Sequence, residues 1–346
     1  RLRELSKIKV LIVDDSILFR QTLERELTND LNIEIVGTAI DADDAMEKIQ
    51  SLKPDVLTLD VELPKMNGLD FLKKMLPIYP IPVVVVTSQP LSALNALDAG
   101  AVDFVKKPEV KSSLDLHGFI NELTIKIKIA STARIVKKHL ASTPRFQHIA
   151  FSKQEDHPII AIGASTGGTE AILSILRDLP PLTPGIVVVQ HMPPVFTNMY
   201  AQRLNKICQL HVREAKNKDR VVPGTVLIAA GEYHLRLAKD SRGYYVKSEK
   251  GAKVSGHCPS VDVLFESVAE VAKNKAIGVI LTGMGADGAA GLTKMRRAGA
   301  YTIGQDKESC VVYGMPMVAF NKGGVTKQLP LNKISGEIIR QLNSEK

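Results

Sequence analysis

The sequence is poor in cysteine and in aromatic residues. It contains no Trp, and Phe and Tyr together make up only 5% of its residues. Its three cysteines, Cys208, Cys258 and Cys310, are an odd number and show no C-x-x-C spacing. This pattern argues against a disulfide framework and against a zinc site, and it fits a reducing compartment.

Long hydrophobic runs are missing as well. The longest apolar runs, such as Val83 to Val86 and Ile159 to Ile162, have the length of strands and are too short to cross a bilayer. The chain begins with Arg-Leu-Arg-Glu-Leu, without an initiating Met and without the apolar stretch of a signal peptide. We therefore expect a cytoplasmic protein without membrane insertion, whose N-terminus has been shortened.

Positive charge is in excess, but one segment carries most of it. The formal net charge is +8, and between Leu123 and Gln154 the chain has seven Lys and Arg but no Asp or Glu. The rest of the chain is nearly neutral. Such a block is more often a solvated linker than a groove for a polyanion, so we expect no binding of nucleic acid.

The length of 346 residues and the hydrophobic content of 45% are sufficient for two globular domains. Residues 8–129 alternate short β-branched runs with helical stretches, which predicts a doubly wound α/β domain with five parallel strands. The segment 130–156 loses this periodicity and contains most of the basic block, which predicts a basic interdomain linker. An apolar strand then opens a second α/β domain, which we assign to residues 157–346.

The second domain is predicted to be doubly wound as well, around a mainly parallel sheet. Beyond its first strand, buried strands are expected at 185–189, 226–229, 276–281 and 300–303. The stretch 224–247 shows shorter alternating patterns, which predict antiparallel hairpins added to the main sheet.

Acidic side chains follow the strands of the first domain. Asp14 and Asp15 follow its first strand and Asp60 its third, so a doubly wound sheet brings the three carboxylates to one edge, where their oxygens suit Mg²⁺. Thr87 ends the fourth strand and Lys107 follows the fifth, and both can bind the oxygens of a phosphoryl group on Asp60. Any one Asp alone is more often a helix N-cap or a loop carboxylate. Their coincidence at consecutive strand ends favours a phosphoryl-transfer site.

These residues carry a family resemblance. Together with Asp14-Asp15, Thr87 and Lys106-Lys107-Pro108, the run from Asp60 to Gly68 resembles the response-regulator receiver family across the domain. The resemblance implies a (βα)5 fold and phosphorylation of Asp60 by a histidine kinase with Mg²⁺. It also implies that Thr87, Phe104 and Lys107 are switch residues that respond to phosphorylation.

The second domain opens with a strand, a glycine turn and a helix, for which we consider two interpretations. As a dinucleotide loop the turn fits poorly, because Ser165 replaces the middle glycine and the acidic residue near the expected ribose position, Asp178, lies inside the helix. As a nucleophile elbow, G-x-S-x-G, the turn matches at Gly163, Ser165 and Gly167. Because the G-x-S-x-G motif alone is a modest signal, the choice between a dinucleotide loop and a nucleophile elbow depends on whether catalytic partners for Ser165 are present.

Suitable partners for Ser165 occur after two other strands. His191 follows an apolar strand, and Asp287 lies in a glycine-rich loop after another, so the three side chains are expected at one sheet edge. We predict that His191 removes the Ser165 proton and that Asp287 orients the imidazole. Backbone N–H groups of Thr166 and Met284 are the candidates for an oxyanion hole. The chain order Ser, His, Asp differs from that of α/β-hydrolases.

The other histidines are weaker candidates for a catalytic role. His211 and His234 lie in strand-like runs and are interpreted as structural residues. His257 and Cys258 suggest a metal site or a thiol nucleophile, but no second ligand pair has matching spacing. We expect their loop to lie near the active site.

At this point the resemblance extends over nearly the entire chain, to the bacterial chemotaxis protein-glutamate methylesterases. The motifs that carry it, after the receiver and the linker, are Gly163–Gly168, Gln190–Pro194, Pro259–Asp262, Leu281–Gly288 and Gly314–Pro316. It implies hydrolysis of glutamate γ-methyl esters and deamidation of glutamines on the cytoplasmic helices of chemoreceptors, without a cofactor for the esterase reaction. It also implies that the unphosphorylated receiver blocks the catalytic cleft. Val195 departs from the pattern, where a glycine is expected.

The sequence also allows two other functions. A receiver followed by a basic segment is also found in transcription factors, although the linker shows no helix-turn-helix pattern. A nicotinamide-dependent reductase rests on the glycine loop alone. The hydrolase is favoured because three strand-end residues would otherwise coincide by accident.

Overall fold

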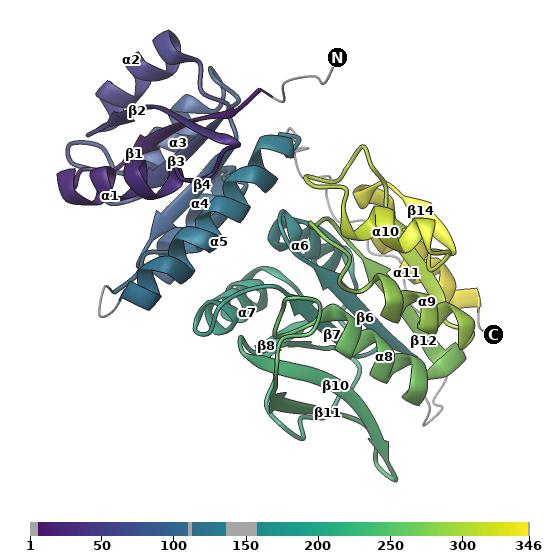
Figure 1. Cartoon of the computed structure of the whole chain (residues 1–346). Coiled ribbons are helices and arrows are strands. Elements are labelled where there is room, and N and C mark those ends of the chain that lie inside the picture. The colour runs from purple at the N-terminus through teal and green to yellow at the C-terminus, as the bar shows by residue number, and fades with distance from the viewer. Residues whose placement is uncertain (1–5, 110–112, 136–157, 345–346) are drawn as a thin grey trace. The chain divides into compact units, whose positions relative to one another are not determined.

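The computed structural model describes residues 6–109, 113–135 and 158–344. The chain divides into two compact units, Arg1–Ile135 and Val136–Lys346, each with its own sheet (Figure 1). Among the helices of the described ranges, none combines the length and apolar character that a bilayer span requires.

The predicted linker, 130–156, begins inside a helix. The helix α5 extends through Thr132, three residues past the predicted domain end at Ile129. Most of the remaining linker belongs to residues 136–157, which lie outside the described part of the chain.

The N-terminal unit contains a five-stranded parallel sheet, as predicted, and its strand order is β2-β1-β3-β4-β5. Its strands are β1 Ile8–Val13, β2 Ile33–Ala39, β3 Val56–Asp60, β4 Val83–Thr87 and β5 Asp103–Lys106. Its helices are α1 Ile17–Leu27, α2 Ala42–Leu52, α3 Gly68–Met75, α4 Pro90–Ala99 and α5 Ser113–Thr132. Helix α1 contacts α5, whereas α3 contacts α2 and α4, so helices cover both faces (Figure 1).

The central strands of this unit explain why its sequence has continuous apolar runs. Every residue of β3 and of β4 is buried, since helices on both faces remove any solvent-exposed side. Only the strand ends are free to carry polar groups for a site. Asp60 is the last residue of β3, and Thr87 is the last residue of β4.

The C-terminal unit contains a seven-stranded parallel sheet with the order β14-β13-β12-β6-β7-β9-β8. Its strands are β6 Ile159–Ala164, β7 Ile186–Gln190, β8 His211–Glu214, β9 Thr225–Ile228, β12 Ala276–Ile280, β13 Tyr301–Gln305 and β14 Lys327–Leu329. Its helices are α6 Gly168–Asp178, α7 Phe196–Ile207, α8 Val261–Val271, η1 Lys273–Lys275, α9 Ala289–Arg297, α10 Met315–Asn321 and α11 Leu331–Ser344.

The predicted antiparallel element is present, but it is not an extension of the main sheet. Strands β10 Tyr233–Asp240 and β11 Gly243–Lys250 form a separate two-stranded sheet that pairs with no strand of the main sheet, although Tyr245 of β11 makes one isolated bridge to Arg220. The reason is packing: β10 buries Leu235 and Leu237 and contacts helix α8. The start of the predicted stretch, β9, belongs instead to the parallel sheet.

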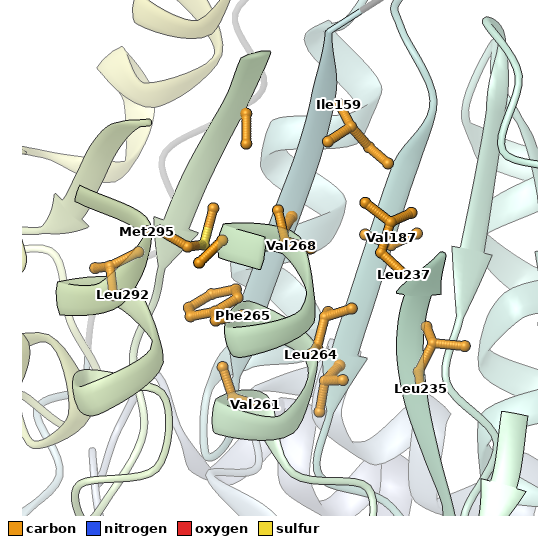
Figure 2. Packing of buried hydrophobic residues seen from close by; sticks show 14 of the residues in the cluster. Ile159, Val187, Leu235, Leu237, Val261, Leu264, Phe265, Val268, Leu292 and Met295 are labelled. Carbon is orange, nitrogen blue, oxygen red and sulfur yellow. The ribbon is translucent and has the colours of Figure 1, made fainter. Parts of the chain in front are cut away.

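Helix α8 forms the centre of the core on one face of the larger sheet (Figure 2). Its side chains Leu264, Phe265 and Val268 are fully buried together with Ile159 of β6 and Val187 of β7. Helix α9 approaches α8 closely at Gly291, where a Cβ atom would lie 2.6 Å from the Cβ of Phe265. The position of α8 matters for function, because its N-terminus faces the candidate site described below.

Truncation of Phe265 tests this core. We expect Phe265→Ala to lower the free energy of unfolding of the C-terminal unit by about 3–5 kcal/mol, because it leaves a cavity beneath α8. Phe320→Ala is the matched control, since that ring is 49% exposed, and it should change stability by less than about 0.5 kcal/mol. Urea unfolding followed by circular dichroism measures both. Equal effects of the two substitutions would contradict the assignment of Phe265 to the core.

Candidate functional sites

Three carboxylates meet at the carboxyl edge of the N-terminal sheet. One ligand oxygen from each of Asp14, Asp15 and Asp60 lies within 4.8 Å of the others. Asp14 and Asp60 are buried, whereas Asp15 is exposed. Clustered carboxylate oxygens open to solvent on one side suit a cation that keeps part of its water shell, as Mg²⁺ does. The pocket is typical of a Mg²⁺ site.

Lys107 joins two of these carboxylates. Its Nζ lies 2.9 Å from Asp14 Oδ2 and 2.7 Å from Asp60 Oδ2. Burial raises the pKa of Asp14 above its usual range, although the hydrogen bond and charge of Lys107 oppose this shift. Burial also works against the charge on Lys107, but the hydrogen bonds to Asp60 and Asp14 outweigh it and raise the pKa of the ammonium. The ammonium is therefore held in its charged form beside Asp60.

The remaining residues predicted for this site lie on β4 and β5. Thr87 is buried, its hydroxyl accepts a hydrogen bond from Gln89 N at 3.1 Å, and its carbonyl accepts one from Lys107 N at 3.0 Å. Phe104 is also buried, in β5. Sequence reasoning missed Phe19, whose ring lies under Lys107 Nζ at 4.4 Å from the centroid. A cation–π contact of this kind is a weak attraction, and no local sequence motif predicts it.

Ser165 lies in the turn between β6 and α6 of the C-terminal unit. Gly167 has a φ of 79°, which favours glycine, and Gly168 N donates to the Ser165 carbonyl at 2.7 Å. Ser165 N donates to Thr282 O at 3.0 Å, beside Gly283. A Cβ atom on Gly283 would lie 2.7 Å from the Cβ of Ser165, so glycine is needed there for the two loops to approach. This is a tight strand-to-helix turn, as the elbow motif predicts.

Strand pairing brings His191 to the same edge as Ser165. The last residues of the neighbouring strands β6 and β7, Ala164 and Gln190, are paired in register, and Ser165 and His191 follow them. The buried side chain of Gln190 links the ends of the two strands, because its Nε2 donates a hydrogen bond to the Ser165 carbonyl at 2.9 Å. Sequence reasoning had given Gln190 no role of its own.

His191 and Asp287 form a direct side-chain contact. His191 Nε2 lies 2.8 Å from Asp287 Oδ2. The other ring nitrogen, Nδ1, is buried and has no hydrogen-bond partner within the described residues. With its Nε2–H donated to Asp287, a neutral imidazole presents Nδ1 as a proton acceptor. This is the state that a general base requires.

The N-terminus of helix α8 holds the Asp287 carboxylate. Ser260 Oγ donates to Asp287 Oδ1 at 2.7 Å, and the backbone N–H groups of Val261 and Asp262 donate at 2.8 and 2.9 Å. Burial opposes ionisation of Asp287, but the hydrogen bond and charge of His191, with these backbone N–H groups, outweigh it and lower the pKa of the carboxyl. A buried carboxylate with this many donors stays charged and fixed in direction.

The two candidates for an oxyanion hole lie in the adjacent loops. Thr166 is buried, and its carbonyl accepts a hydrogen bond from Thr282 Oγ1 at 3.0 Å. Met284 is 46% exposed and follows Gly283, whose carbonyl accepts the N–H of Met315 at 2.7 Å. The use of their own N–H groups stays a prediction.

Two further residues of this site were not assigned from the sequence. Ser260 lies within the motif Pro259–Asp262, and a serine directly before an apolar helix is an N-cap signal that could have identified it. Its hydroxyl accepts a hydrogen bond from Val263 N. His257 was expected near the site, and its ring stacks on that of His191 with centroids 3.6 Å apart and planes 8° from parallel. Nothing in the local sequence predicts that contact.

Comparisons with known proteins agree with both units. A family model described as CheB methylesterase matches residues 160–338, and one described as response regulator receiver domain matches residues 10–117. Protein-glutamate methylesterase/protein-glutamine glutaminase 2 of Syntrophomonas wolfei subsp. wolfei is 52% identical over 339 residues, which cover 98% of this chain and 99% of the relative. The protein-glutamate methylesterase/protein-glutamine glutaminase of Yersinia pestis is 46% identical, with 98% of both chains covered.

A solved structure supports the fold of the C-terminal unit. The CheB methylesterase catalytic domain of Thermotoga maritima is 41% identical, with a TM-score of 0.52, and the match covers 54% of this chain and 98% of that one. The sequence expectations of a receiver and a methylesterase are thereby confirmed. The alternatives of a transcription factor and a nicotinamide-dependent reductase are set aside.

Removal of the Ser260 hydroxyl tests the support of Asp287. We expect Ser260→Ala to lower the free energy of unfolding by about 1–2 kcal/mol, because a buried carboxylate loses a donor and α8 loses its cap. We expect esterase activity to fall at the same time. Ser267→Ala is the matched control for activity, since this buried serine of the same helix donates to Leu264 O and accepts from Leu237 N, away from Asp287. Full activity in Ser260→Ala would contradict the role of the hydroxyl.

The raised pKa of Asp14 predicts that Mg²⁺ binding depends on pH. A larger fraction of Asp14 is protonated in mild acid than for an ordinary Asp, so the cation must displace a proton there. We expect more protons to be released on Mg²⁺ binding at pH 5 than at pH 8, as measured by calorimetry in buffers of different ionisation enthalpy. Asp14→Asn should remove most of this difference. The same proton release in the variant would show that Asp14 is not the group that titrates.

Proposed function

The chain belongs to the CheB family of protein-glutamate methylesterases/protein-glutamine glutaminases with a receiver domain, and on this premise we propose how its residues perform the reaction. The substrate is a glutamate γ-methyl ester, or a glutamine, on the cytoplasmic helices of a chemoreceptor. Ser165 is the nucleophile, His191 the general base, and Asp287 the residue that orients the base.

The reaction proceeds in two halves at Ser165. The Ser165 oxygen attacks the γ-carbonyl while His191 Nδ1 takes its proton, and the backbone N–H groups of Thr166 and Met284 stabilise the oxyanion. Collapse of this intermediate releases methanol, or ammonia from glutamine, which leaves with the proton from His191. Water then attacks the acyl-enzyme with the help of the same base, and the products are a free glutamate and Ser165.

The main support for His191 as the general base is the bonding of its two ring nitrogens. The His191 ring uses one nitrogen for the buried Asp287 and leaves the other without a partner within the described residues, at the sheet edge where Ser165 lies. A structural histidine in a core is expected to have both nitrogens bonded, as His234 does with Ser260 N and Ala252 O. A buried imidazole nitrogen without a partner supports a role in proton transfer.

The N-terminal unit controls this reaction through phosphorylation of Asp60. A histidine kinase is the donor. Asp14, Asp15 and Asp60 would hold a Mg²⁺ ion, which when bound would supply positive charge to offset that of the transferred phosphoryl group. Lys107 and Thr87 bind the phosphoryl oxygens once the group is on Asp60. Phe104 and Thr87 then move between two arrangements, which releases the block that the unphosphorylated receiver places on the catalytic unit.

Methanol release from methylated receptor membranes tests the proposal. The assay compares the parent chain, Ser165→Ala and Asp60→Asn, each with and without a small phosphodonor and Mg²⁺. We expect Ser165→Ala to lose activity by at least about a thousandfold, as removal of a hydrolase nucleophile does. Asp60→Asn should keep the basal rate and lose the stimulation.

Two results would count against the proposal, one for each site. Methanol release that survives in Ser165→Ala would remove the serine from the mechanism. Undiminished stimulation of Asp60→Asn by the phosphodonor would remove Asp60 from the regulation. Ser174→Ala, which changes a serine within helix α6, is the matched control for the catalytic unit and should behave like the parent.

A further inference from the structure

The His191 imidazole is covered on one face by a second imidazole. The rings of His191 and His257 are stacked, with centroids 3.6 Å apart and an angle of 8° between their planes. The mechanism above gives His257 no task, although its ring lies directly against the proposed base. With centroids this close and planes this nearly parallel, the His257 ring lies over the face of the His191 ring.

The segment that carries His257 is a tight turn. Val254 and His257 exchange two backbone hydrogen bonds of 2.9 Å, and the residues between them, Ser255 and Gly256, have φ values of 52° and 83°. Two central residues with positive φ are typical of a type I′ turn, which is rigid for its length. The turn therefore presents the His257 ring in a defined direction.

Hydrogen bonds anchor this turn to the residues that hold Asp287. Ser255 Oγ donates to Asp262 Oδ2 at 3.2 Å, and the N–H of Asp262 donates to Asp287. Buried His234 ties both ends of the loop, because one ring nitrogen bonds Ala252 O at 2.7 Å and the other bonds Ser260 N at 3.2 Å. One framework thus places Asp287 at the edge of the His191 ring and His257 on its face.

From this geometry we propose that His257 is a positioning residue that fixes the ring plane of His191. The proposal deepens the proposed function, on which it rests. The bond to Asp287 fixes one nitrogen but leaves the imidazole free to swing about the axis of that bond and about its own Cβ–Cγ bond, whose torsional preference is broad. A ring stacked on the face blocks both motions, because either would drive an edge of His191 into His257. Nδ1 is then kept in one direction, as the acceptor of the Ser165 proton in the proposed mechanism.

The physical role belongs to the flat face of His257, and its nitrogens are not required. A phenyl ring of similar breadth should therefore replace the imidazole, whereas a methyl group should not. Loss of orientation affects the step in which His191 takes the proton and leaves substrate binding unchanged. The effect is expected in kcat.

The test compares His257→Ala and His257→Phe in the full-length chain. Two readouts are needed: kcat and KM for methanol release, and the rate at which a fluorophosphonate probe labels Ser165, which reports activation of the serine without a receptor. We expect His257→Ala to lower kcat and the labelling rate about threefold to tenfold, with KM changed by less than about twofold. His257→Phe should restore most of both rates. His211→Ala, which changes an exposed histidine of β8, is the control and should match the parent.

Each alternative outcome has a distinct meaning. Unchanged rates in His257→Ala, or rates in His257→Phe as low as in His257→Ala at an unaltered unfolding midpoint, would overturn the positioning role. A rise in KM with kcat unchanged would do so as well, because it would assign His257 to substrate binding. Failure of the proposed function would give a different pattern. Methanol release would persist in Ser165→Ala, while His257→Ala would still lower the rate at which the probe labels Ser165.

Discussion

Parallel strands end at a common edge of their sheet, and each of the two sites depends on this constraint. In the N-terminal unit the ends of β1, β3, β4 and β5 bring together acidic, hydroxyl and ammonium groups for a phosphoryl group. In the C-terminal unit the ends of β6, β7 and β12 bring together a serine, a histidine and a carboxylate. The strands themselves are buried on both faces, so polar chemistry is confined to their ends.

A charge at such an edge needs partners, and the two units supply them differently. Asp60 and Asp14 share one ammonium, Lys107, and the other oxygen of each accepts a single backbone N–H, while the neighbouring Asp15 is exposed. Asp287 instead receives the hydroxyl of Ser260, two backbone N–H groups of α8 and the His191 ring. The first arrangement can exchange ligands, whereas the second is closed and holds one side chain in place.

Residues placed by the ends of the strands could be predicted from the sequence, whereas residues placed by tertiary packing could not. Ser165, His191 and Asp287 follow recognisable neighbouring strands, so the edge rule was sufficient to place them at one edge of the sheet. Ser260 and His257 reach the same site through the position of α8 and its preceding turn, which tertiary packing sets. The hairpin β10–β11 was recognised from its alternation, but its separation from the main sheet depends on burial against α8, which alternation does not encode.

We propose that Asp287 fixes His191 in the tautomer whose unprotonated nitrogen, Nδ1, accepts the proton of Ser165. Nitrogen-15 NMR of the histidine side chains, at a pH where His191 is neutral, measures this directly. We expect His191 to carry its proton on Nε2, with the chemical shift of an unprotonated nitrogen at Nδ1, and we expect Asp287→Asn to disturb this preference. A proton on Nδ1 in the parent protein would contradict it.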